Sequence, residues 1–466
     1  MAERRGEMFL VVIVAIALGV GLAWDLLGSP VAAPATTPQE GTLFHEKALF
    51  CPPRPEGTKG FTSVTTWASN GEAADVSVGN SEATELSGDN ARVEKVTKEG
   101  AFNVVGSGAP LLAGVTMNFT EPYAAVGAAQ CSDTASGEWY FPEGSSDFRF
   151  DERILLYNPF PDEAVVRITF ITPRGEESNS NLARVAVPSG ESVDTAISTF
   201  TEHKPALAIS VSAIRGRVVA WKAMFSNAEG RRPGVDLSLG ATATSTRAFF
   251  PVGRADDASD ERVTILNPSD EEALVSVSLM TKNGPIQEFV DKKVSRRSSR
   301  ILDLGSLTGK KAPPLGPLSV HVESTNGVGI IAEEDVSLGS AGYEGVGSDL
   351  AIVEPSTAWW FGPAAVSPSQ DGIVVLNLGA KPVTLNVTLL GTSGGPRTPD
   401  SLQGIKVRAG QRGAIDLSDF SSKGSFVVRL DADQPVVASR LAQGDGDIGL
   451  VAGTPIVEPD ATPSAP

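Results

Sequence analysis

The stretch RILLYNP, residues 153–159, is an apolar run that ends on an asparagine and a proline. Closely similar stretches are RVTILNP at 262–268 and GIVVLNL at 372–378, and a weaker copy is VTTWASN at 64–70. The four asparagines Asn70, Asn158, Asn267 and Asn377 are therefore 88, 109 and 110 residues apart. A regular recurrence of this kind is the signature of a repeat protein. The sequence predicts four copies of one module.

Short strands and turns fill each copy. An aromatic opener comes first, as in EWYFPEG at 138–144, TRAFFPVG at 246–253, AWWFGP at 358–363 and the degenerate ALFCPP at 48–53. After each asparagine an alternating run such as VTLNVTL at 383–389 indicates a half-buried strand. About seven short strands with regular turn signals are typical of an immunoglobulin-like β-sandwich. The sequence predicts an all-β fold of four tandem sandwiches, with a closed β-propeller-like ring as the alternative.

The predicted division of the chain follows these repeats. It comprises a cytoplasmic N-terminus (1–7), a transmembrane signal anchor (8–27), a linker (28–47), four modules (48–133, 134–246, 247–357 and 358–455) and a disordered tail (456–466). Modules two and three end with a shared Gly-x-Asp-Leu element, at 234–237 and 347–350, and Gly446-Asp447-Ile448 is similar. We expect this element to be an extra edge strand or an ordered linker that couples neighbouring modules.

Composition restricts the partners. The chain has 38 Lys and Arg against 56 Asp and Glu, a net charge of −18, which repels phosphate backbones. Nucleic acid is therefore not expected as a partner. With three histidines and two cysteines in 466 residues, the chain offers little to a soft metal ion, and neither a metal nor a cofactor is predicted.

The N-terminus indicates the compartment. Residues 8–27, MFLVVIVAIALGVGLAWDLL, contain a single charge and are long enough to cross a bilayer as a helix. Arg4 and Arg5 precede this segment and the next cation is Lys47, so the bulk of the chain should be extracytoplasmic. The expected location is the cytoplasmic membrane with a single pass. The alternative is secretion after cleavage near Ala33-Pro34-Ala35.

Three stretches carry a family resemblance: WYFPEG at 139–144, YNP at 157–159 and PVVASR at 435–440. Together they resemble an actinobacterial domain family of unknown function that occurs in exported repeat proteins. The resemblance extends over about 48–455 and is weakest in the first module. It implies an exported location and a repeated β fold, and it implies no activity.

A search for catalytic residues gives no convincing constellation. GTSGG at 391–395 fits a nucleophile elbow as a string, but Pro396 follows where that motif requires a helix. His321 lies in an alternating strand, LSVHVES, without a recognisable partner. No catalytic residue is assigned, and the protein is not expected to be an enzyme.

Two groups of residues are candidate binding surfaces. A cationic cluster in module three could dock an anionic partner, although an ordinary solvated hairpin tip is the simpler interpretation. The paired aromatic residues could form a platform for sugars, although strand alternation favours core packing for half of them. The first group is Lys292, Lys293, Arg296, Arg297 and Arg300, and the second is Trp139, Tyr140, Trp359 and Trp360.

The two cysteines are predicted to form a disulfide in module one. Repeat alignment puts Cys51 at the position of Phe141 and Cys131 at the position of Phe225, as though one packing contact had been replaced by a covalent one. An exported chain meets oxidising conditions, which favour the bond.

The function expected from these features is that of a non-enzymatic, membrane-anchored scaffold in the bacterial cell envelope. It would be a rod of sandwiches whose partner is another envelope protein. The alternative is a carbohydrate- or wall-polymer-binding protein.

Overall fold

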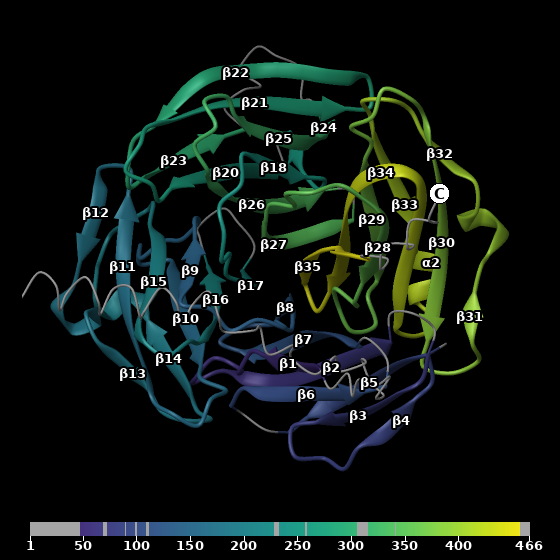
Figure 1. The fold of residues 1–466 in the computed structure, drawn as a ribbon. Coiled ribbons are helices and arrows are strands. Elements are labelled where there is room, and N and C mark those ends of the chain that lie inside the picture. Colours follow the sequence, from purple (N-terminus) through teal and green to yellow (C-terminus); the bar gives the residue numbers. More distant parts are fainter. Residues whose placement is uncertain are drawn as a thin grey trace, which may run out of the picture. The chain divides into compact units, whose positions relative to one another are not determined.

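A computed structural model of the chain describes residues 47–68, 72–88, 90–97, 100–108, 111–227, 233–256, 259–304, 316–340 and 342–456. Within these ranges the protein is almost entirely β, which confirms the prediction of an all-β protein (Figure 1). None of the described helices is long and apolar enough to cross a membrane. The predicted anchor at 8–27 and the tail from residue 457 onward lie outside the described residues.

All four segments predicted as modules consist of antiparallel sheets: two in each of modules one and two, two and a short two-stranded sheet in module three, and one nine-stranded sheet in module four. Module one comprises β1 (Lys47–Cys51), β2 (Lys59–Ala68), β3 (Ala74–Val78), β4 (Thr84–Leu86), β5 (Ala91–Val96), β6 (Phe102–Ser107), β7 (Leu111–Glu121) and β8 (Ala125–Gln130). Module two comprises β9 (Glu138–Phe141), β10 (Phe150–Tyr157), β11 (Ala164–Thr172), β12 (Gly175–Ser178), η1 (Ser180–Leu182), β13 (Val185–Val187), β14 (Ser192–Ala196), η2 (Ile197–Thr199), β15 (Ala208–Arg215), β16 (Val219–Ser226) and β17 (Gly234–Leu239).

The second half of the chain repeats this order. Module three comprises β18 (Arg247–Phe250), β19 (Arg254–Ala255), β20 (Ser259–Asn267), β21 (Ala273–Thr281), β22 (Gly284–Val294), β23 (Ser298–Asp303), β24 (Gly316–Pro317), β25 (Ser319–Ser324), β26 (Ile331–Ser340) and β27 (Tyr343–Leu350). Module four comprises β28 (Ser356–Phe361), β29 (Gln370–Leu376), β30 (Val383–Gly391), β31 (Pro396–Arg397), η4 (Asp400–Leu402), β32 (Ile405–Val407), β33 (Arg412–Asp416), α2 (Ser418–Ser421), β34 (Phe426–Gly444), β35 (Asp447–Ala452) and β36 (Thr454–Pro455).

All four modules share one strand topology. Numbering the main strands of a module from one to eight, one sheet has the order 1-6-3-4 and the other 5-2-7-8, as in β9-β15-β11-β12 and β14-β10-β16-β17. In module four the long β34 serves as both the sixth and the seventh strand. The 2–5 and 3–6 pairings are those of an immunoglobulin domain, but the first and seventh strands have exchanged sheets relative to that fold. Module one, the weakest repeat in sequence, has the same topology as the others.

The repeated asparagine closes the turn between the second and third strands. In module three the Nδ2 of Asn267 donates to the carbonyls of Glu271, Val294 and Ser295, at 2.6, 3.1 and 3.2 Å, while Oδ1 accepts from the Ser269 N–H at 3.0 Å. Asn377 makes the four corresponding contacts, and Asn158 makes three of them, with the carbonyls of Asp162 and Val187 and the Phe160 N–H. All three are buried. In module one the strand register places Ala68 at this position, and Asn70 lies outside the described residues.

The eighth strands join the modules. They are β8, β17, β27 and β35, and the Gly-x-Asp-Leu elements predicted as edge strands lie in the middle two (Figure 1). β8 contacts β17, β17 contacts β27, β27 contacts β35, and β35 contacts β8. Contact between the last module and the first is incompatible with the expected rod, in which only sequence neighbours touch. None of the sheets of the described region closes on itself.

Apolar packing also crosses module boundaries. The rings of Phe119 in β7 and Phe225 in β16 meet edge-to-face with centroids 5.2 Å apart, in one buried cluster that extends through modules one and two. Trp67 of module one is buried in a cluster with Trp360 and Val427 of module four. The modules therefore share core residues with their neighbours.

Replacing Asn267 by alanine should lower the free energy of unfolding by about 3 kcal/mol, because the turn would lose the hydrogen bonds of this buried amide to three backbone carbonyls and one N–H. Urea unfolding of the purified protein measures the change. Asn181→Ala, at an exposed position in η1, is the control and should change stability by less than about 0.5 kcal/mol. Equal stability of the two variants would show that the asparagine does not close the turn.

Candidate functional site

Asp447, the first residue of β35, accepts hydrogen bonds from the backbones of the other three modules. Its Oδ2 accepts from Val235 N–H at 2.7 Å and from Val126 N–H at 3.4 Å, and its Oδ1 accepts from Val346 N–H at 2.9 Å. The residue is fully buried. Burial raises the pKa of this carboxyl to about 8, although the surrounding backbone N–H groups oppose the shift.

Glycines make this approach possible. A Cβ at Gly345 would lie 2.1 Å from Asp447 Oδ1, and one at Gly234 would lie 2.7 Å from the same atom. Gly345 also has φ of +147°, which side-chain-bearing residues rarely adopt. The glycine of the Gly-x-Asp-Leu element in module two is thus required by the space that Asp447 occupies.

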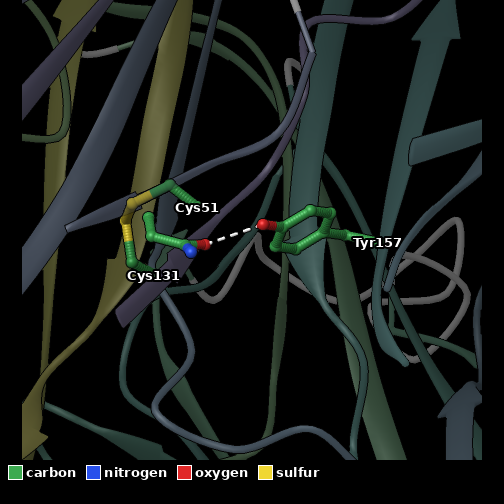
Figure 2. Close-up of a disulfide and its surroundings, with 4 residues drawn as sticks. Cys51, Cys131 and Tyr157 are labelled. Atoms are coloured by element: carbon green, nitrogen blue, oxygen red, sulfur yellow. Dashed lines mark hydrogen bonds between the residues drawn. A yellow bond between two sulfur atoms is a disulfide. The ribbon is translucent and has the colours of Figure 1, made fainter. Parts of the chain in front are cut away.

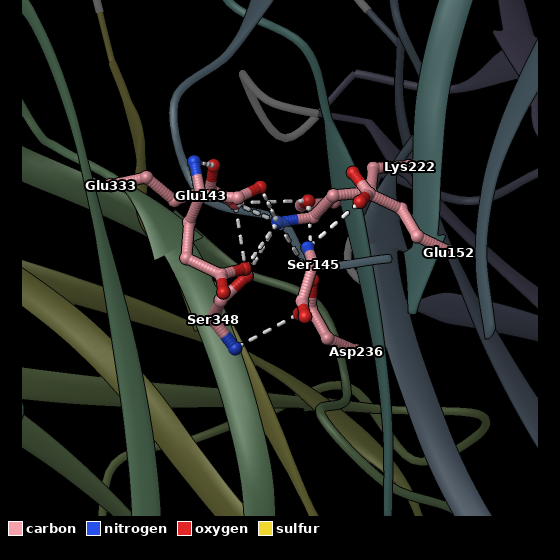
Figure 3. A network of polar contacts seen from close by, with 8 residues as sticks. Glu143, Ser145, Glu152, Lys222, Asp236, Glu333 and Ser348 are labelled. Carbon is pink, nitrogen blue, oxygen red and sulfur yellow. Dashed lines mark hydrogen bonds and ion pairs between the residues drawn. The ribbon is translucent and has the colours of Figure 1, made fainter. Parts of the chain in front are cut away.

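A second polar cluster joins modules two and three around Lys222 of β16 (Figure 3). Its Nζ lies 2.6 Å from Glu333 Oε1, 3.1 Å from Glu143 Oε2 and 3.6 Å from Asp236 Oδ2. Ser348 Oγ donates to the same Glu333 oxygen at 3.0 Å. The side chains of Lys222 and Glu333 are both 0 % exposed. A buried pair of this kind is very costly to break, because a lone charge would remain in the interior.

The carboxyls outnumber the cation in this cluster. Burial raises the pKa of Glu143 to about 8 and, with the neighbouring carboxylates, raises the pKa of Asp236. Glu152 of β10 is also buried nearby, accepting from Ser145 N–H at 2.9 Å, and burial raises its pKa well above the usual value. Proton retention by carboxyl groups near neutral pH is the physical consequence.

The same strand position recurs in every module with different chemistry. The position lies on the seventh strand and pairs with the same point of the second strand in all four modules. Its residues are Lys222 in module two, Arg440 in module four, Glu334 in module three and Val115 in module one. A second position, two residues earlier on the second strand, carries Glu152, Asp371, Glu261 and Thr62 in modules two, four, three and one. Modules two and four combine an acid with a cation, whereas module three has two acids and module one has none.

In module four the pair is direct. Arg440 Nε lies 2.9 Å from Asp371 Oδ1 and its Nη2 lies 2.5 Å from Oδ2, while Nη1 donates to the carbonyls of Gly362 and Phe426. Both side chains are at most 2 % exposed. A bidentate guanidinium–carboxylate contact with its other donors satisfied is a form in which a buried ion pair is well tolerated.

In module three the two acids face one another. Burial, and then the nearby Glu261, raise the pKa of Glu334 well above its usual range. Arg412 of module four approaches these acids, and burial lowers the pKa of its guanidinium to about 10. Module three is therefore rich in buried carboxyls, with Lys222 of module two and Arg412 of module four near them.

In module one the structure contains the predicted disulfide, with Cys51 and Cys131 4.4 Å apart between Cα atoms (Figure 2). Tyr157 of module two lies beside it and donates to Asn103 Oδ1 at 2.9 Å. The two cysteines are 80 residues apart in the sequence. In the chain-entropy model, closing a loop of that length stabilises a fold by about 4 kcal/mol.

The alignment that predicted the bond was correct for one cysteine and wrong for the other. Cys131 follows the eighth strand, and its N–H donates to Ala113 O as Gly240 N–H donates to Ala220 O, so Cys131 corresponds to Gly240 and not to Phe225. A Cβ at Gly240 would lie 2.7 Å from the Phe141 ring. The disulfide thus replaces the packing of a phenylalanine ring over a glycine.

The predicted aromatic platform does not form. Trp139, Trp359 and Trp360 are buried, and Tyr140 is half-buried. The indole N–H groups of Trp139 and Trp359 donate to the carbonyls of Val218 and Val436. The tryptophan rings belong to the cores, the interpretation that strand alternation favoured for half of these residues.

The cationic cluster is at the surface but is partly neutralised. Lys293 pairs with Glu272 at 3.0 Å, and Arg297 pairs with Asp270 and, across the module boundary, with Glu176 of β12 at 3.3 Å. Arg296 is exposed, and Lys292 and Arg300 are half-buried.

A pocket of about 330 Å³ lies where all four modules meet. Its lining includes Gln130 of β8, Leu239 of β17, Leu350 of β27 and Val451 of β35. Asp349, from the Gly-x-Asp-Leu element of module three, also lines it. The Oδ2 atom of Asp349 is buried and has no hydrogen-bond partner among the described residues.

A second pocket of about 330 Å³ lies between modules three and four and is lined by Arg254, Tyr343 and Arg412 among others. No group of three or more His, Cys, Asp or Glu side chains in the described ranges is arranged to hold a metal ion.

The Lys222 and Asp447 contacts were missed by the sequence analysis. Their members are 111 residues apart for Lys222 and Glu333, and 321 for Asp447 and Val126. One signal was available: VVAWKAM and VVASRLA place a cation at the same point of two otherwise apolar strands. A cation there must be paired internally, which would have indicated buried carboxylates.

These features define an all-β repeat protein whose four modules meet through buried polar contacts. The family model described as "Family of unknown function (DUF5719)" matches residues 91–353 and 350–466. The chain belongs to this family.

Solved structures show only weak likeness. Thermotoga maritima 1070 has 19% identity, with 24% of this chain and 96% of that chain covered and a TM-score of 0.20. A tetra-tandem repeat from the extending region of a large adhesion protein has 11% identity, coverage of 88% and 99%, and a TM-score of 0.11. PNGF-II has 8% identity, coverage of 86% and 100%, and a TM-score of 0.15. These scores are too low to carry an argument. Comparison with curated proteins gives no match.

Raising the pH should destabilise the fold. Glu143 and Asp447 hold protons up to about pH 8 in the folded state, whereas unfolded carboxyls release theirs near pH 4. Their stabilising contribution is complete below about pH 4 and is lost as the pH rises through 8, by about 1.4 kcal/mol per pH unit for each retained proton.

Urea unfolding between pH 5 and 8.5 measures this slope. Glu143→Gln should reduce the slope by the contribution of one proton, and Glu121→Gln, at an exposed surface pair with Lys59, should leave it unchanged. A slope that is identical in Glu143→Gln and the unmodified protein would contradict proton retention by Glu143.

Proposed function

We propose that this protein is a non-enzymatic interaction scaffold of the bacterial cell envelope, tethered to the cytoplasmic membrane by residues 8–27 and presenting its modules outside the cytoplasm. Its partner is another envelope protein. The observation that carries the proposal is the Cys51–Cys131 bond, because a structural disulfide persists in an oxidising compartment. The apolar segment with Arg4 and Arg5 before it supports the same orientation.

For the fold, we propose four immunoglobulin-like sandwiches in the broad sense, joined in a cycle through their eighth strands. The antiparallel strand order that the modules share and the cyclic contacts support this architecture. The first and seventh strands depart from the immunoglobulin order, so the likeness is one of architecture.

The arrangement of charges favours a scaffold over an enzyme. The buried charged groups at Lys222 and Arg440 are held by carboxylates from their own or a neighbouring module. Such contacts stabilise one arrangement of modules, and that leaves the outer strands and turns to contact a partner.

Wall-polymer binding is the second candidate, and one observation favours it. Lys293, Arg296 and Arg297 are exposed on an acidic chain, where they could meet a polyanion. The burial of the tryptophans removes the other support for this function, and the ion pairs of Lys293 and Arg297 weaken it further.

Crosslinking in intact cells of the native host, followed by purification of the full chain, tests the proposal. We expect the chain in the membrane fraction with oxidised cysteines, crosslinked to a protein partner. The combined variant Lys293→Glu and Arg296→Glu should retain that partner, as should the control Lys406→Glu and Arg408→Glu in the corresponding turn of module four. Recovery of the chain in the cytoplasmic fraction with free thiols would contradict the proposal. Sedimentation with purified wall polymer that only the module-three variant loses would favour the second candidate instead.

A further inference from the structure

The pocket where the four modules meet has the size and lining of a ligand site. Its volume of about 330 Å³ falls within the range of pockets that enclose small ligands. The walls are mostly apolar side chains from three modules, namely Leu237, Leu239, Ile352, Val353, Leu450 and Val451. Such walls accept an aliphatic or alicyclic body and give it no orientation.

One polar atom in the wall would orient a ligand. Asp349 Oδ2 is buried and unpartnered among the described residues, and Asp349 lines the pocket. Leaving a buried polar atom without a partner destabilises the fold, so a ligand that supplies a donor recovers that free energy. Backbone N–H groups of Ala452 in module four and of Leu350 act on the same carboxyl group and oppose the rise of its pKa.

The charged groups near Asp349 determine whether the pocket favours a cationic or an anionic ligand. Burial, and then the negative charges of Asp236 and Glu333, raise the pKa of this carboxyl well above its usual range. The cation closest to them, Lys222, is already held by Glu333 and Glu143. At the mouth, Glu354 is exposed and pairs with Arg247 at 3.3 Å. An anionic head group would meet repulsion here, whereas a cation would be attracted.

We propose that this pocket binds an ammonium group on a short apolar stem, with the ammonium donating to Asp349 and the stem against the leucines and valines. The chemistry is the same for a free alkylamine and for a lysine side chain of a partner. This inference does not depend on the proposed location or scaffold function, because it rests on the pocket alone.

Titration calorimetry on the full chain in nanodiscs, with empty nanodiscs as the blank, tests the proposal with three ligands that share one ring. Cyclohexylmethylamine should bind at least about tenfold more tightly than cyclohexylmethanol, since a charge-assisted hydrogen bond adds about 1.4 kcal/mol or more. Cyclohexanecarboxylate should not bind. Equal affinity for amine and alcohol, or no binding by either, would overturn the proposal.

Point variants distinguish the contribution of the Asp349 carboxyl group to binding from that of the apolar cavity. Asp349→Asn should lose the preference for the amine while still binding the alcohol, and Glu354→Gln at the mouth should change amine affinity by less than about twofold. Val353→Trp, at a pocket residue that is 41% exposed, should block both ligands without requiring a core change. Unchanged amine binding in Asp349→Asn or in Val353→Trp would place the ligand elsewhere and refute the site.

The two sources of the ammonium group are distinguished with peptides. An acetylated peptide with one central lysine, compared with its norleucine counterpart, should compete with cyclohexylmethylamine if a partner's lysine is the natural occupant. Competition by neither peptide assigns the site to free amines, provided that the amine itself binds.

Discussion

Pairing buried polar groups where four β modules meet is the constraint on which the rest of this structure depends. Asp447 brings one carboxyl group against backbone donors of three other modules, and Lys222 brings one ammonium group against carboxylates of two modules. Each side chain has a partner in its own module, Ile448 N–H for Asp447 and Glu143 for Lys222, but its remaining partners lie in neighbouring modules. The cost of leaving such a group unpaired exceeds that of most single apolar contacts, so these residues specify which surfaces must meet.

The modules carry chemically different residues at the same buried strand positions. Module four uses an internal bidentate pair, Arg440 with Asp371, and module two extends its lysine to Glu333 of the next module. Module one has Val115 and Thr62 at these positions and carries a disulfide where modules two and four pack a ring over a glycine. A covalent bond in the module with the weakest repeat signal fits the general need of small cores for an additional constraint.

Local features of this fold were readable from the sequence, whereas long-range contacts were not. Period-two alternation and the recurring asparagine predicted the strands and the repeats, since both depend on residues within one or two strands. The contact of β35 with β8 was missed, and a rod was expected. The sequence of a strand does not indicate which distant strand packs against it. Cys131 was assigned to the wrong strand for a similar reason: module one lacks the charged residue that marks the seventh strand in its neighbours.

The candidate site was less predictable than the fold. The tryptophans and the module-three cations were singled out because they are conspicuous as residue types, yet the former are core residues and several of the latter have ion-pair partners. The residues that meet at the centre, such as Asp349 and Asp236, looked like ordinary edge-strand aspartates. Their burial follows from the association of modules, which only the tertiary structure contains.

Hydrogen exchange tests most directly whether Asp447 couples the four modules. In Asp447→Asn, the amides of β8, β17 and β27 should lose protection together with those of β35, because one acceptor for three other modules has been weakened. Asp445→Asn, at an exposed turn residue two positions earlier, should leave all four strands protected. Loss of protection confined to β35 would contradict the account and would show that the modules hold together without this carboxyl.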